Sequence, residues 1–129
     1  IKKDKKFKLI NSSYKNGGKF ENMKIFFKNM SLSDLVICSG GLTMFDALNL
    51  NKTTIVLDQY NHQLKNINRL KKRRLVNYLN KSKIGRLYSL INTINNKNSL
   101  EKLQKRINDY KKYQRPMEII KKINKIYEN

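Results

Sequence analysis

The feature that most constrains the fold is an apolar run of strand length that stops at two glycines and leads into a helical pattern. Leu35–Cys38 shows no alternation, which is typical of a strand buried on both faces of a sheet. Gly40 and Gly41 follow, and adjacent glycines let the backbone turn tightly and approach a ligand. Leu42–Leu50 then carries apolar residues at helical spacing. The pattern predicts a strand, a glycine turn and a helix.

A second strand and helix follow at once. Thr53–Leu57 is apolar and ends in the polar loop Asp58–Gln63, and an amphipathic helix begins near His62 and extends to Arg73. Parallel strands deliver such loops to one carboxyl edge of the sheet, where ligands bind in open α/β folds. A helix N-terminus behind glycines offers free N–H groups and a partial positive charge to a phosphate. We therefore expect a phosphate-binding site at this edge.

The remaining strand predictions extend the sheet on both sides of this unit. Phe7–Ile10, Met23–Phe27 and Leu75–Leu79 are apolar runs that predict strands, Asn11–Gly18 has the composition of a loop, and Asn29–Ser33 predicts one helical turn. The expected fold class is α/β, a Rossmann-like parallel sheet flanked by helices.

The C-terminal third is predicted to be helical. Ser82 is the expected cap of a helix that ends near Ile94, and Asn98 with Glu101 forms a capping-box pattern before the next helix. Pro116 fits the first turn of a last helix.

Length favours one domain over residues 1–129, because 129 residues are too few for two domains of ordinary size. The chain begins on Ile1, which suggests a piece of a longer protein.

No apolar run approaches the roughly eighteen residues of a membrane span, so any membrane contact is expected to be peripheral. The single Cys38 fits a reducing compartment, and its expected role is that of a small apolar residue.

The formal charge of +20 would ordinarily point to nucleic acid or an anionic membrane. Here 23 of the 29 basic residues are Lys, spread over most of the chain, whereas nucleic-acid readers favour Arg. The only compact run is Lys71–Arg74, which we interpret as the solvated end of a helix rather than a binding patch.

These residues also carry a resemblance. Ser39-Gly40-Gly41-Leu42-Thr43, then Asp46, then His62, Gln63 and Asn66 resemble the nucleotide-sugar signature in the C-terminal domain of GT-B glycosyltransferases. The most similar families are the family 28 N-acetylglucosaminyltransferase of peptidoglycan synthesis and the UDP-sugar hydrolase of pseudaminic acid biosynthesis. The resemblance covers roughly Met23–Asn80.

The resemblance implies the C-terminal half of a GT-B fold, a nucleotide-sugar-binding domain that is a fragment of a two-domain enzyme. The complete enzyme would transfer or hydrolyse a UDP-sugar in cell-surface polysaccharide biosynthesis, in the cytoplasm or at the inner membrane face. The missing N-terminal domain would supply the acceptor site and the catalytic base, so this chain alone is expected to be inactive. No cofactor and no metal are expected, since one His and one Cys cannot make a site without distant carboxylates.

Each residue of the signature has a structural alternative. Gly40 and Gly41 either admit a diphosphate or only form a tight turn. Thr43 can bind a phosphate oxygen or act as the helix N-cap, and the two uses are compatible. By resemblance Asp46 takes the place of a Glu that holds the ribose hydroxyls, and its alternative is the second half of a Thr-x-x-Asp capping box.

The second half of the signature is read in the same way. Gln63 resembles the glutamine that contacts the sugar, through an amide that both donates and accepts. His62 either donates to phosphate or only starts a helix, and Asn66 lies one turn later on the same face. Asp58 and Tyr60 lie in the same loop and could reach the ligand.

One departure from the family pattern concerns the end of the first helix. Asn51 stands where the family has Gly, and because Asn tolerates the left-handed conformation the turn is expected to survive. Two functions of other classes remain open, a non-catalytic nucleotide-binding module and a basic nucleic-acid-binding domain.

Overall fold

The computed structural model describes residues 23–113 and 123–126, and the chain divides into two compact units, Ile1–Ser33 and Asp34–Asn129. The described part of the first unit consists of helix α1 (Met23–Leu32) and Ser33. Residues 123–126, which belong to the second unit, are also helical. The strand predicted at Phe7–Ile10, the loop at Asn11–Gly18 and the start of the last helix at Pro116 lie outside the described residues.

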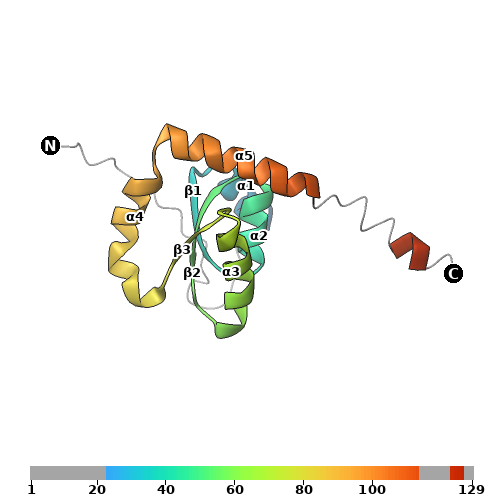
Figure 1. Ribbon diagram of the computed structural model, residues 1–129, viewed down its shortest axis with the longest axis horizontal. Helices are drawn as coiled ribbons and strands as arrows, with labels where there is room; N and C mark the ends of the chain where they lie inside the picture. The colour runs from blue at the N-terminus through green and yellow to red at the C-terminus, as the bar shows by residue number, and fades with distance from the viewer. Residues whose placement is uncertain (1–22, 114–122, 127–129) are drawn as a thin grey trace. The chain divides into compact units, whose positions relative to one another are not determined.

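The second unit is built on a parallel sheet, in the order β1 (Leu35–Ser39), β2 (Thr53–Leu57) and β3 (Asn77–Leu79). Helix α2 (Leu42–Asn49) connects the first pair of strands and α3 (Leu64–Lys72) the second. The Rossmann-like α/β fold with a parallel sheet flanked by helices is thereby confirmed (Figure 1).

The core lies on one face of the sheet. Val56 on the central strand is fully buried, and Cys38 and Tyr78, its partners in register on the two neighbouring strands, pack against the same cluster. The helices and the loop before β3 contribute the rest of the cluster, which contains Met44, Leu48, Ile67, Leu70, Leu75, Val76, Leu103 and Ile107. Burial of these side chains removes apolar area from water, the main stabilising contribution to folding.

Helix α5 (Lys97–Tyr113) runs across the amino edge of the sheet (Figure 1). Three of its side chains donate to backbone carbonyls of the loops that precede β2 and β3. Gln104 Nε2 donates to Asn51 O at 2.6 Å, Arg106 Nε to Arg74 O at 2.9 Å, and Lys111 Nζ to the carbonyl of Asn49 at 2.6 Å. The helix thus holds both loops through backbone acceptors.

Those two loops share one helix-ending geometry. Asn51 follows α2 with φ 58° and Arg74 follows α3 with φ 56°, both in the left-handed region. In each loop the next residue's N–H reaches back to a helix carbonyl, Lys52 to Ala47 and Leu75 to Leu70, which completes a Schellman motif. The expectation that Asn51 preserves the turn is therefore confirmed.

Four predictions about elements were wrong, and local ambiguity explains them. Met23–Phe27 is helical, because a five-residue run with four apolar residues fits a helix as well as a strand. The helix predicted from Ser82 is a 3-10 helix, η2 (Lys81–Arg86), followed by α4 (Leu87–Ile94), and Asn80 caps η2 by accepting from Ser82 N–H. Likewise Asn96, not Asn98, accepts from the N–H of the third residue of α5, Ser99. Several Asn and Ser residues near each helix start compete for one cap.

The fourth correction concerns β1. The continuous apolar run predicted burial on both faces, yet Ile37 remains 40% exposed. Burial on both faces holds instead for β2, where Ile55 and Val56 are completely buried between two neighbouring strands. Within the described residues β1 is an edge strand, and the apolar pattern does not distinguish an edge from a centre.

Candidate functional site

The glycine turn lies at the carboxyl edge of the sheet, between β1 and α2. Gly41 is the N-cap of α2, with φ −93° and ψ −153°, and no side chain caps the helix. Thr43 is therefore inside the first turn and is not the N-cap, which removes the Thr-x-x-Asp capping box as a role for Asp46. The first N–H groups of α2 are left for water or a ligand.

Both glycines face the start of α3. A Cβ on Gly40 would lie 2.6 Å from Ile67 Cδ1 and 3.2 Å from Gln63 Cβ, and one on Gly41 would lie 3.2 Å from Gln63 Nε2. Real Cβ atoms essentially never approach within 3.0 Å, so Gly40 is required for helix packing. The turn is tight for a structural reason, and this close packing brings Gln63 against it.

Gln63 holds the most unusual polar atom of the site. Its Oε1 is buried and, in the part of the chain that the structure describes, has no hydrogen-bond partner. A buried acceptor without a donor costs about 1–3 kcal/mol. Sequence reasoning singled out this residue, but only the structure shows that its amide oxygen needs a donor.

Asp46 lies one helical turn beyond the glycines and is half-buried. Among the described residues, nothing donates a hydrogen bond to its carboxylate or forms an ion pair with it. Thr43 and Ser39 are also half-buried, whereas Leu42 at the first position of α2 is 83% exposed. The carboxylate is thus available to a ligand that reaches over the turn.

The loop after β2 contributes an exposed aromatic pair. Tyr60 and His62 stack with ring centroids 5.6 Å apart and an interplanar angle of 16°. His62 belongs to the 3-10 helix η1 (Asn61–Gln63), which leads into α3, and Asn66 is exposed on the first turn of α3. The structure thus places these side chains next to Gln63 in the chain.

Asp58 has a structural partner. Its carboxylate accepts from Lys81 N–H at 2.5 Å, and it lies beside the Tyr78 hydroxyl. Desolvation, together with that carboxylate, raises the pKa of Tyr78. Asp58 therefore ties the loop after β2 to the loop after β3.

Cys38 is an apolar core residue, as expected. Burial raises the pKa of its thiol to about 12, so the thiolate form is suppressed at neutral pH.

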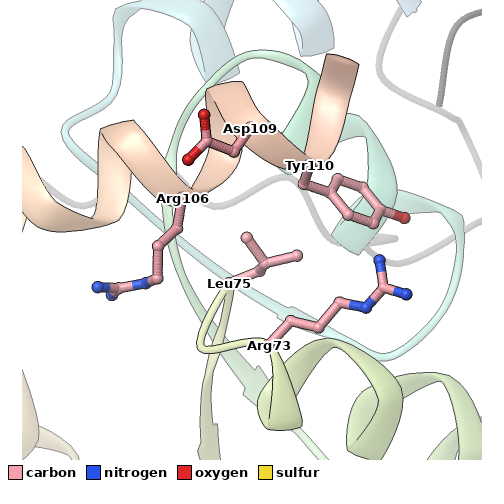
Figure 2. A pocket seen from close by; sticks show the side chains of 5 residues that line it. All are labelled: Arg73, Leu75, Arg106, Asp109 and Tyr110. Atoms are coloured by element: carbon pink, nitrogen blue, oxygen red, sulfur yellow. The ribbon is translucent and has the colours of Figure 1, made fainter. Parts of the chain in front are cut away.

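A cavity of about 190 Å³ lies at the opposite, amino edge of the sheet (Figure 2). Leu75 forms its floor, and α5 supplies Arg106, Asp109 and Tyr110. The guanidinium carbon of Arg73 lies 5.5 Å from the Tyr110 ring centroid, so this arginine covers the ring. Sequence analysis missed this cavity, because its lining combines two segments about thirty residues apart that no local pattern connects.

In the described ranges, 23–113 and 123–126, no three His, Cys, Asp or Glu side chains cluster in a way that could hold a metal ion. Among these same residues, no helix combines the length and apolarity needed to cross a bilayer.

Comparison of the chain with known proteins found no matching family model, no matching curated protein and no matching solved structure.

Proposed function

We propose that residues 34–113 form a nucleotide-sugar-binding domain that takes a UDP-sugar, as part of a glycosyltransferase or a UDP-sugar hydrolase of cell-surface polysaccharide biosynthesis. The observation that carries the proposal is the contact of Gln63 with the glycine turn. Its buried Oε1 lacks a donor at the very edge where the uncapped N-terminus of α2 opens. A ligand with both phosphates and hydroxyls satisfies both groups.

The site offers one kind of partner to each part of such a ligand. The first N–H groups of α2 and its dipole favour a diphosphate. The Asp46 carboxylate, one turn along, can accept from two vicinal ribose hydroxyls at once. Gln63 Oε1 accepts from a sugar hydroxyl. Asp46 and Gln63 are both half-buried, and because Gln63 Oε1 itself is buried, the amide would have to turn toward the ligand to accept from it.

The reaction of the complete enzyme would be attack at the anomeric carbon with UDP as leaving group. In this domain the turn amides and the α2 dipole would stabilise the charge that develops on the diphosphate. A second domain would supply the acceptor site and the catalytic base, and the chain alone would bind without turnover. The proposed location is the cytoplasm, at the inner membrane face.

Ligand-dependent melting tests the proposal. UDP and UDP-N-acetylglucosamine at millimolar concentration should raise the melting temperature, because a ligand that binds only the native state stabilises it, by about 2.7 kcal/mol at a hundredfold excess over Kd. UMP and inorganic phosphate are the controls for the diphosphate. If no nucleoside diphosphate or nucleotide sugar shifts the melting curve, the proposed function is wrong.

A further inference from the structure

The segment that follows β3 exposes apolar side chains next to cations. Helix α4 has no charged residue, and although most of its side chains are large and apolar, none of its eight residues is buried. Ile84 in η2 is 49% exposed and Tyr88, four residues later, is 52% exposed. A Cβ on Gly85 between them would meet no atom within 4 Å, so this surface is open. Figure 1 shows α4 on the other side of the strands from α2 and α3.

Cations lie on the N-terminal side of this apolar surface, in η2. Lys81, Lys83 and Arg86, all in η2, are exposed. They belong to a longer segment, residues 59–100, that contains ten Lys and Arg and no Asp or Glu. The charge of this segment is therefore positive throughout, and its cations in η2 adjoin the exposed apolar side chains of η2 and α4, with Asp58, whose carboxylate accepts from Lys81 N–H, as an acidic neighbour.

We propose that η2 and α4, residues 81–94, form a membrane-contact element that binds the surface of an anionic bilayer. A short helix of this kind lies in the interface with its apolar side chains at the boundary between headgroups and acyl chains, and anionic lipids add attraction for each cation. Tyr88 has the amphipathic ring that favours this depth. The segment is far shorter than a membrane span, so it binds without crossing.

The coincidence of apolar and cationic residues favours a bilayer over nucleic acid. Phosphate contacts with nucleic acid need cations and gain nothing from an exposed isoleucine. Helix α3 exposes Lys65, Arg69 and Lys72, beside Lys71, but none of its own large apolar side chains is exposed. Nucleic-acid binding would therefore depend on α3 at least as much as on η2, whereas bilayer binding depends on η2 and α4.

Vesicle sedimentation of the full 129-residue chain, without nucleotide, tests the proposal. We expect binding to vesicles of phosphatidylcholine with phosphatidylserine and little binding to phosphatidylcholine alone. Replacement of Lys81, Lys83 and Arg86 by Gln should lower the partition coefficient by roughly tenfold or more. Ile84→Ser should lower it severalfold at unchanged charge. The matched control, Lys65, Arg69 and Lys72 to Gln, removes the same charge from α3 and should have the smaller effect.

Melting curves of each variant establish that the fold is kept, and Tyr88→Ser repeats the apolar test at a second position. Absence of binding to the anionic vesicles overturns the proposal. So does an equal loss in the α3 control, which indicates diffuse charge, or an Ile84→Ser variant that binds like the parent. Binding of RNA homopolymers that is lost in the α3 variant and kept in Ile84→Ser assigns the charge to nucleic acid instead.

Discussion

Ile67 occupies the space that a side chain on Gly40 would need, so the glycine turn after β1 and helix α3 pack closely against each other. Gly40→Ala should therefore destabilise the protein by about 1–3 kcal/mol, the usual cost of overpacking. Urea unfolding measures the loss, and Ile67→Ala on the same chain should make the two effects less than additive. Gly85→Ala is the control, since nothing lies near its Cβ, and it should stabilise the chain slightly or leave it unchanged.

Replacement of Gln63 by Met separates stability from binding. The change removes the buried Oε1 that lacks a donor and keeps the length of the side chain, so the free protein should gain about 1–3 kcal/mol in stability. Affinity for the UDP-sugar should fall, and affinity for UDP should change less, because the sugar hydroxyl loses its acceptor. Thermal melts and calorimetric titrations give both quantities. A variant that is less stable than the parent would show that Oε1 is satisfied in solution.

Asp46→Asn tests the ribose contact. If the carboxylate accepts from the ribose hydroxyls, the substitution should weaken UDP binding by about 1.5–3 kcal/mol, as for a hydrogen bond to a charged group. Stability should change little, because Gly41 caps α2 and Asp46 is no part of a capping box. Calorimetric titration with UDP measures the affinity. Unchanged affinity would remove Asp46 from the site.

The positive φ of Arg74 predicts a stabilising substitution. A non-glycine residue in the left-handed region carries a cost that glycine avoids, so Arg74→Gly should stabilise the chain by up to about 1 kcal/mol. The Arg74 carbonyl, which accepts from Arg106, is kept. Lys72→Gly, two residues earlier at the end of α3, should instead destabilise the chain by about 1 kcal/mol, and denaturant midpoints compare the two.

Alkaline pH should weaken the fold through Cys38. Its pKa is raised from 9.0 to about 12, so between these values the folded chain retains a proton that the unfolded chain loses. The contribution to stability is full below about pH 9 and falls as the pH rises toward about 12. Cys38→Ala should show a shallower decline over this interval in urea unfolding. An identical decline would assign the effect to other groups such as Tyr78, whose pKa is also raised.

The sequence predicted the part of the fold where patterns are local and strong. Leu35–Cys38, Leu42–Leu50 and Thr53–Leu57 correspond to β1, α2 and β2, because each run has the length and spacing of one element bounded by Gly, Asn or Asp. The strand predicted at Met23–Phe27 was wrong because five residues, four of them apolar, are too few to show a period. The exposure of Ile37 could not be predicted because it depends on which strands pair, a non-local property.

The arrangement of residues around the proposed site was predictable from the sequence only in part. Polar loops after two parallel strands indicated the carboxyl edge, and the structure brings Gly41 and Gln63 together there. The reason for Gly40 is its contact with Ile67, more than twenty residues away, which no local pattern encodes. The identity of the ligand, the enzyme class and the partner domain remain predictions.

The arrangement of α5 has a consequence for how this protein can evolve. Its side chains hold the loops before β2 and β3 through the carbonyls of Asn49, Asn51 and Arg74, which every amino acid possesses. Most side chains in those loops can therefore change without loss of these bonds, whereas Asn51 is constrained because its Oδ1 also accepts from Lys111 Nζ at 2.7 Å. At this edge of the sheet, tolerance of substitution is thus set by the left-handed backbone at Asn51 and Arg74 more than by the identity of the loop side chains.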